Sequence, residues 1–312
     1  MNKILITGTS GFIGSHLANN LKRKHKIIGF SRTSSNIKSI QEINDDIVNI
    51  EKYQSQLKGV KQVYHLAACI DFSRAAFKES IRVNVLGTQK LLKLCRQIKI
   101  DKFVFVSAGA TLGFAKNSNN PVKETSHYLP SKSHSYAYSK YLAEKAVLRY
   151  SPYFKVMVVN PPTVYGDPQA DSTSLIKLIA ANKFIIFFPG GTSYIDIDDL
   201  VTGVNQVMRL GRNKNRYILS AENLTYRQLI NRVTQVLNKK VAIFILPKFT
   251  FYPLIVTIKI FELFFPNSKF LNSNILTAFY QYRYFNTSKA QKQLKFSPQY
   301  KLEDSIKKIY NQ

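Results

Sequence analysis

Hydrophobic positions in the first half of the chain form two kinds of pattern. Short apolar runs, which are typical of buried strands, alternate with longer segments whose apolar residues recur every three or four positions, as in amphipathic helices. The runs predict strands at residues 3–6, 26–30, 62–66, 102–107 and 155–160, and the periodic segments predict helices at 15–23, 80–97 and 137–150. This alternation predicts an α/β fold, in which a doubly wound parallel sheet carries helices on both faces.

The second half of the chain changes character. Apolar runs at 194–199 and 216–219 predict strands that rejoin the sheet, whereas the chain from residue 223 carries a helical pattern, prolines and an aromatic-rich tail. We therefore expect a first domain over residues 1–165, to which the strands near 193–220 return. The remainder, residues 166–312, is expected to form mainly a smaller C-terminal substrate domain.

Composition limits the class of protein. With 312 residues, 45% of them hydrophobic, the chain is long and apolar enough to bury a large core. Its two cysteines, Cys69 and Cys95, lack the spacing of metal ligands. We therefore expect no disulfide and no metal site, and a reducing cytoplasm as the compartment. The first strand begins at once, which is expected to leave no room for a signal peptide.

The stretch 249–265 is the most apolar of the second half. It contains Pro253, Lys259 and Glu262, and so does not resemble a membrane span. Three interpretations stay open for it: it lines an apolar pocket, touches a membrane surface or fills a core.

The formal net charge is +27, and the lysines are scattered over the chain without an RNA-stacking signature or a recognition helix. We therefore expect no nucleic-acid partner. Most of the charge is expected on solvated faces, with some of it steering an anionic cofactor.

Three glycines follow the first predicted strand at a fixed spacing. Gly8 permits a tight turn, Gly11 lets the main chain approach a phosphate, and Gly14 lets the following helix pack closely on the strand. The N–H groups of the first helical turn then face the anion, with the helix dipole behind them. The pattern predicts a dinucleotide site that includes Gly8, Ser10, Gly11, Phe12, Ile13 and Gly14.

A tyrosine and a lysine stand near the start of the helix predicted at 137–150. Tyr136 and Lys140 are four residues apart, so their side chains project from one helical face. A free phenol has a pKa of about 10, and an ammonium group one turn away favours its phenolate form. The pair is suited to exchange a proton with a substrate near neutral pH.

Together, the glycine turn and the Tyr–Lys pair resemble the extended short-chain dehydrogenase/reductase family, the NAD-dependent epimerase/dehydratase superfamily, whose fold is a Rossmann sheet. The resemblance spans nearly the whole chain, and several blocks are especially similar to its dihydroflavonol-reductase-like and hopanoid-associated members. The matching blocks include Asp46-Ile47, His65-Leu66-Ala67-Ala68, Asn84-Val85-Leu86-Gly87-Thr88, Asn160-Pro161-Pro162-Thr163 and Asn223-Leu224-Thr225.

The resemblance implies roles for individual residues. Tyr136 would donate or accept the proton, and Lys140 would bind the nicotinamide ribose and tune Tyr136. Asn84 would support the proton relay; the alternative is that its polar side chain only hydrogen-bonds to helix backbone groups. The further cofactor contacts are expected at Asp46, Ile47, Leu66, Ala67, Ala68, Pro161 and Thr163. A homodimer through the helices that carry Asn84 and Tyr136 is expected by the same analogy.

Cofactor choice depends on the end of the second predicted strand. An acidic residue there would bind the ribose hydroxyls and repel a 2′-phosphate, but this chain has Ser31 followed by Arg32. A guanidinium group can meet a phosphate with two hydrogen bonds. We therefore expect NADP to be preferred over NAD, with Arg32 on the cofactor; otherwise Arg32 is a solvated loop residue.

One position departs from the family. The catalytic Ser or Thr usually stands second in a pair of hydroxyl residues after the fourth strand, where this chain has Ala108. Ser107 precedes it, although neighbouring strand side chains point to opposite faces, and Thr111 follows beyond Gly109. Three interpretations stay open: Ser107 or Thr111 supplies a relocated hydroxyl, the enzyme is weak, or the protein is an NADP-binding sensor or scaffold. We favour the first and take Ser107 as a catalytic candidate.

The expected function is an NAD(P)-dependent oxidoreductase that moves hydride between the nicotinamide and a carbonyl or secondary alcohol of a small molecule. The alternative in the same family is a nucleotide-sugar epimerase or dehydratase that retains its cofactor tightly and clasps a diphosphate with basic residues. The available residues are Arg209, Arg212, Arg227 and Arg283.

Overall fold

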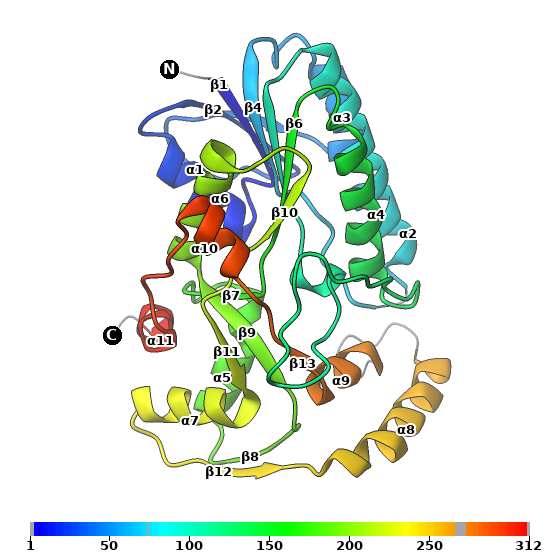
Figure 1. The fold of residues 1–312 in the computed structure, drawn as a ribbon, viewed down its shortest axis with the longest axis vertical. Helices are drawn as coiled ribbons and strands as arrows, with labels where there is room; N and C mark the ends of the chain where they lie inside the picture. The colour runs from blue at the N-terminus through cyan, green and yellow to red at the C-terminus, as the bar shows by residue number, and fades with distance from the viewer. Residues whose placement is uncertain (1–2, 74, 266–272, 311–312) are drawn as a thin grey trace.

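The computed structural model describes residues 3–73, 75–265 and 273–310. Its centre is a parallel seven-stranded sheet with the strand order β10-β6-β5-β4-β1-β2-β3 (Figure 1). The strands are β1 (Lys3–Thr7), β2 (Lys26–Ser31), β3 (Gln41–Asn44), β4 (Val60–His65), β5 (Lys102–Val106), β6 (Lys155–Asn160) and β10 (Asn215–Ile218). The predicted α/β fold with a doubly wound parallel sheet is confirmed.

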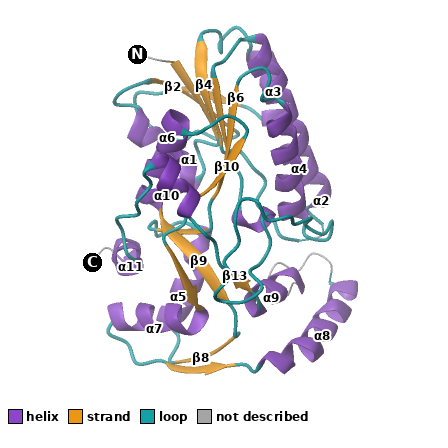
Figure 2. Cartoon of the chain, in the orientation of Figure 1, coloured by secondary structure: helices purple, strands orange, loops and turns teal. Residues whose placement is uncertain are grey.

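Helices cover both faces of this sheet (Figure 2). One face carries α1 (Phe12–Leu21), α6 (Ile197–Leu210) and α10 (Ser288–Leu294). The other carries α2 (Phe77–Ser80), a π-helical segment (Ile81–Gly87), α3 (Thr88–Gln97) and α4 (Ser135–Arg149). A 3-10 helix (Ile47–Tyr53) packs against α3, and short 3-10 turns lie at Gly109–Thr111, Asp171–Thr173 and Lys248–Thr250. Two apolar cores result, one on each side of the sheet.

A smaller second layer lies beyond the carboxyl ends of the large sheet's strands. Its main sheet joins β11 (Glu222–Thr225), β9 (Gly191–Asp196) and β13 (Tyr282–Arg283), with β7 (Thr163–Tyr165) also pairing with β9. A parallel pair, β8 (Phe184–Phe187) and β12 (Ala242–Ile245), stands apart. The accompanying helices are α5 (Ser174–Ala181), α7 (Tyr226–Val236), α8 (Phe251–Phe264), α9 (Ser273–Tyr280) and α11 (Leu302–Tyr310).

The prediction that both late strands rejoin the large sheet is half wrong. β10 does pair with β6, but β9 pairs with β7, β11 and β13 in the second sheet. An apolar run predicts that a strand forms, while its partners are set by segments far away in the sequence.

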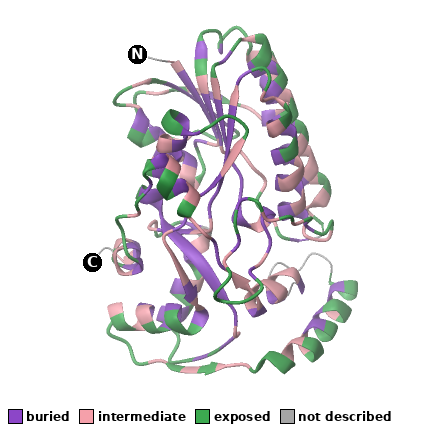
Figure 3. Cartoon of the chain, in the orientation of Figure 1, coloured by how far each residue is buried: buried purple, intermediate pink, exposed green. Residues whose placement is uncertain are grey.

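The apolar stretch 249–265 is not a core segment along its whole length. Ile255 and Ile258 of α8 are buried, whereas Tyr252 is 74% exposed and Leu263 is 75% exposed. Exposed positions mark the outer side of α8 at the edge of the molecule (Figure 3). Among the described residues, no helix has both the length and the apolar character needed to cross a membrane.

Candidate active site

The glycine turn after β1 is built so that backbone, and not side chains, surrounds an open space. Gly8 has a φ of +79°, and a Cβ atom there would lie 2.8 Å from the Ala67 nitrogen. A Cβ atom on Gly14 would lie 2.1 Å from the Gly8 carbonyl oxygen. Gly11 is the N-cap of α1 and supplies no side-chain cap, so no side chain competes there for the first-turn N–H groups. This cradle fits a pyrophosphate.

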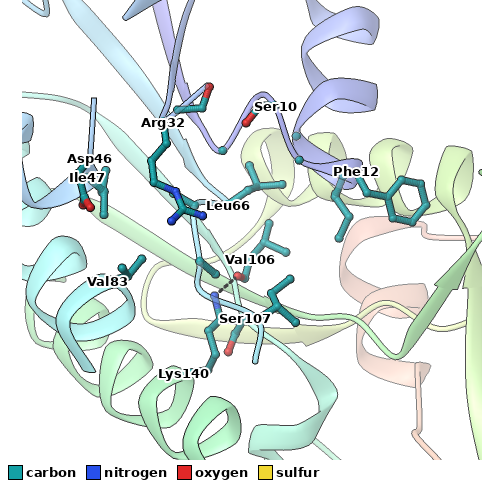
Figure 4. A pocket seen from close by; sticks show the side chains of 18 of the residues that line it. Ser10, Phe12, Arg32, Asp46, Ile47, Leu66, Val83, Val106, Ser107 and Lys140 are labelled. Atoms are coloured by element: carbon teal, nitrogen blue, oxygen red, sulfur yellow. Dashed lines mark hydrogen bonds between the residues drawn. The ribbon is translucent and has the colours of Figure 1, made fainter. Parts of the chain in front are cut away.

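One cleft gathers most of the residues expected in the site (Figure 4). Those that line it are Gly8, Ser10, Gly11, Phe12, Ile13, Gly14, Arg32, Asp46, Ile47, Leu66, Ala67, Ala68, Ser107, Tyr136 and Lys140. The cleft lies at the carboxyl ends of β1, β2, β4 and β5, where open parallel sheets bind their ligands.

Three of the expected residues lie outside the cleft lining. The Cys69 N–H donates to the Asn84 side-chain oxygen at 2.7 Å, and the Asn84 amide nitrogen donates to the Cys69 carbonyl at 3.0 Å and to the Ser139 hydroxyl at 2.9 Å. The Asn84 side chain therefore connects the loop after β4 to α4. The Pro161 carbonyl accepts from the Gly109 N–H at 2.7 Å. The Thr163 hydroxyl lies 3.3 Å from that of Thr192 in the second sheet.

The cleft also contains residues that sequence reasoning did not assign to it. These are Ser31, Asp45, Ile70, Val83 and Val106. Ser31 and Val106 end their strands, and that position is a signal that points to the cleft. Asp45 follows the short strand β3, which the hydrophobic pattern does not reveal, and Val83 lies in the π-helical segment.

Lys140 and Tyr136 are both buried at the floor of the cleft. The Lys140 ammonium group donates to the Val106 carbonyl at 2.7 Å and lies 4.1 Å from the centre of the Phe105 ring. Burial lowers the pKa of Lys140 to about 7, although the Glu144 carboxylate opposes the shift. The Tyr136 ring meets that of Phe72 edge-on at 5.4 Å.

Burial also raises the pKa of Tyr136 above its ordinary value. This direction is opposite to that expected from the sequence. Because Lys140 is itself buried and its charged form is disfavoured, the lysine does not offset the cost of burying a phenolate.

The two candidates for the relocated hydroxyl face different surroundings. Ser107 Oγ is buried, its residue lines the cleft, and it has no hydrogen-bond partner within the described part of the chain. Thr111 Oγ1 lies 2.7 Å from the Glu144 carboxylate and 2.9 Å from the Ala108 carbonyl. Thr111 is absent from the described residues that line the cleft.

The far end of the cleft carries Arg32, whose side chain is exposed. The nearby Asp46 carboxylate pairs with Arg82 at 2.6 Å and caps the 3-10 helix through the Val48 N–H at 3.1 Å. Partial burial acts against ionisation, but these hydrogen bonds hold the pKa of Asp46 below its usual range. β2 ends at Ser31, whose hydroxyl is neutral, and no carboxylate takes that place; Ser31 Oγ donates to the Thr33 carbonyl at 2.8 Å.

Comparison with known proteins agrees with this geometry. Residues 4–219 match the model of the NAD dependent epimerase/dehydratase family. The chain is 30% identical over 256 residues to the dTDP-D-glucose 4,6-dehydratase of Dictyostelium discoideum. The aligned region covers 71% of this chain and 59% of that protein. It is 26% identical over 253 residues to dihydroflavonol 4-reductase of Arabidopsis thaliana, covering 71% and 66%. Among solved structures, gox2253 has a TM-score of 0.85 at 24% identity, covering 100% of this chain and 97% of that one.

Proposed function

The chain belongs to the NAD-dependent epimerase/dehydratase family, and we propose that it is an NAD(P)-dependent oxidoreductase acting on a small molecule. Hydride would move between the nicotinamide and a carbonyl or secondary alcohol carbon. The observation that carries this proposal is that the glycine turn and the residues Ser107, Tyr136 and Lys140 line one and the same cleft.

The cofactor we propose is NADP in preference to NAD. The turn from Gly8 to Gly14 would hold the pyrophosphate against backbone N–H groups. Arg32 lines the cleft after β2, where no carboxylate ends the strand, and a guanidinium group suits a 2′-phosphate. The ion pair of Asp46 with Arg82 supports this choice, because it offsets a negative charge that would otherwise repel the phosphate.

The bound nicotinamide would supply or accept the hydride. In the reductive direction, Tyr136 gives its phenolic proton to the substrate oxygen as negative charge develops there. Ser107 Oγ donates a hydrogen bond to the same oxygen, which uses its unpartnered hydroxyl. Lys140 would hold the nicotinamide ribose from the floor of the cleft, which it lines together with Tyr136.

The test is nucleotide binding followed by turnover of a carbonyl and alcohol panel. Tyr136→Phe keeps the ring and removes the proton donor, so turnover should fall by about 10² to 10⁴ while NADPH affinity changes little. Tyr138→Phe is the matched control, since Tyr138 lies on the same helix and stacks on Phe77. A protein with no affinity for either pyridine nucleotide would overturn the proposal.

A nucleotide-sugar epimerase or dehydratase is the second candidate, favoured by the likeness to the Dictyostelium dehydratase. Such an enzyme oxidises and reduces its substrate in one cycle and so keeps its cofactor. None of Arg209, Arg212, Arg227 and Arg283 is among the described residues that line the cleft. Dialysis separates the candidates: a nucleotide that stays bound favours the epimerase or dehydratase, and one that exchanges favours the reductase.

A further inference from the structure

A second surface of the molecule is apolar and exposed. It lies at the end farthest from the seven-stranded sheet, where β8, β12 and α8 follow one another along one edge (Figures 1 and 3). We call the outer sides of these three elements the β8–β12–α8 face. We include in it Phe249, from the 3-10 turn that joins β12 to α8. The large exposed side chains of this face are Phe184, Ile186, Phe244, Phe249, Tyr252, Val256, Ile260, Leu263 and Phe264.

Helix α8 is apolar on two opposite sides. Its inner side packs Ile255 and Ile258 against Leu276 and Tyr280, from α9. Its outer side repeats apolar residues from Tyr252 at the spacing of one helical face, through 256, 260, 263 and 264. Single exposed apolar side chains are normal on a protein surface, but a contiguous stripe marks an interaction site.

The strand pair extends the same surface. β8 and β12 are parallel, with Phe184 opposite Ala242 and Ile186 opposite Phe244. Residues between them, such as Ile185, turn to the other side and join a buried core. The outward side chains are therefore apolar where a two-stranded sheet at the edge of a protein would ordinarily carry polar residues.

The exposed charged side chains within these elements and directly beside them along the chain have one sign. The sequence holds no aspartate or glutamate between Glu222 and Glu262, and Glu262 is turned inward onto Ser273. Exposed lysines stand within the same elements or beside them, at positions 183, 240, 248 and 259. An apolar surface that is surrounded by cations is complementary to an apolar partner with an anionic rim.

We propose that the β8–β12–α8 face docks on an anionic phospholipid bilayer, with α8 lying in the plane of the interface. The helix has 14 residues and is about 21 Å long, so it enters the headgroup region without crossing the membrane. A second copy of this chain is the less suitable occupant, because the same elements of that copy would bring further lysines and no exposed carboxylate.

The experiment is flotation of the full chain with phosphatidylcholine vesicles, with and without phosphatidylglycerol. We expect binding to vesicles that contain phosphatidylglycerol, and loss of that binding at high salt. Leu263→Gln and Phe249→Gln should each lower vesicle affinity by about tenfold. Lys240→Gln and Lys259→Gln should each lower it by about fivefold. Leu210→Gln is the matched control, because Leu210 is 49% exposed on α6, on the other part of the molecule.

Sedimentation of the same proteins without vesicles tests the competing occupant. If the face joins two copies, Leu263→Gln converts a dimer to a monomer and vesicles bind neither protein, which overturns the proposal. Equal binding of the wild type, the Leu263→Gln variant and the Leu210→Gln variant also overturns it. None of these residues lines the active-site cleft, so NADPH affinity should be the same in all variants and reports that each has folded.

Discussion

Thr111 Oγ1 lies 2.7 Å from Oε1 of Glu144, a carboxylate with no exposed surface. Arg216 pairs with the same carboxylate at 2.7 Å, and the Asn160 amide donates to it at 2.7 Å. The Thr111 hydroxyl therefore belongs to a buried polar network that joins α4, β6 and β10. Of Ser107 and Thr111, the two hydroxyl residues that follow β5, Ser107 is the one that stands among the described residues lining the cleft.

This division predicts opposite outcomes for two small substitutions. Ser107→Ala removes the donor that we assign to the substrate oxygen, so kcat/KM should fall by about 10² to 10³ with little change in unfolding free energy. Thr111→Val leaves the cleft intact but removes a hydrogen bond to a buried carboxylate. It should lower the unfolding free energy by about 2 kcal/mol, with kcat/KM close to wild type. Steady-state kinetics and urea titration of both variants check this, and the reverse pattern would assign the role to Thr111.

Arg32 is predicted to decide between the two nicotinamide cofactors. Arg32→Ala should raise the Kd of NADPH by about tenfold or more, which is the loss expected for a charge-assisted pair, and leave the Kd of NADH nearly unchanged. Fluorescence titration of both nucleotides measures this. The matched control is Arg23→Ala, since Arg23 follows α1 and is exposed. Tighter binding of NADH than of NADPH by the wild type would contradict the prediction.

The sequence predicts those parts of the site that depend on local geometry. The glycine turn needs only a strand, a tight turn and a helix in succession, and Tyr136 and Lys140 share a face because they are four residues apart on one helix. Both follow from spacing alone. The confirmed parallel sheet likewise follows from alternating strand and helix patterns.

Other parts depend on contacts that no local pattern records. β3 has the sequence Gln-Glu-Ile-Asn with only Ile43 buried, so it lacks the period of a strand and Asp45 after it goes unassigned. The side-chain partners of the Thr111 hydroxyl, Glu144 and Asn160, lie 33 and 49 residues farther along the chain, so the polar network that holds it cannot be recognised from neighbouring residues. The direction of the Tyr136 pKa shift also depends on burial, which raises the pKa and cannot be read from the spacing of Tyr136 and Lys140.

The depressed pKa of Lys140 predicts how stability depends on pH. The folded protein holds this group at a pKa of about 7, against an ordinary value of 10.5. Between those values the unfolded chain binds the extra proton, so this contribution to stability is fully present above pH 10.5 and is lost as the pH falls to 7. As the pH rises through that window, the unfolding free energy of the wild type should increase relative to that of Lys140→Met by up to about 1.4 kcal/mol per pH unit. Urea titrations of the cofactor-free proteins measure the difference, and parallel curves would contradict it.

His65, the last residue of β4, lies between two threonines. Its Nδ1 is 2.6 Å from the Thr7 hydroxyl and its Nε2 is 2.8 Å from the Thr88 hydroxyl. Thr88 donates its own proton to the Asn84 carbonyl at 2.6 Å, so Nε2 must carry the hydrogen and donate to Thr88. Nδ1 then accepts from Thr7, and the ring is neutral.

Protonation of His65 is therefore predicted to destabilise the protein in acid. The Thr7 hydroxyl already accepts from the Leu66 and Ala67 N–H groups, so a second ring N–H would displace the backbone that lines the cleft. Burial, with a smaller effect of Lys140, lowers the pKa of His65 to about 3 from its ordinary 6.5. Its contribution is complete above pH 6.5 and is lost as the pH falls toward 3, at up to about 1.4 kcal/mol per pH unit. His65→Gln cannot titrate, so its unfolding free energy should fall less steeply than that of the wild type over this range. Equal slopes in urea titrations at pH values from 6.5 down to the acid transition would show that the ring is not held neutral by this contact.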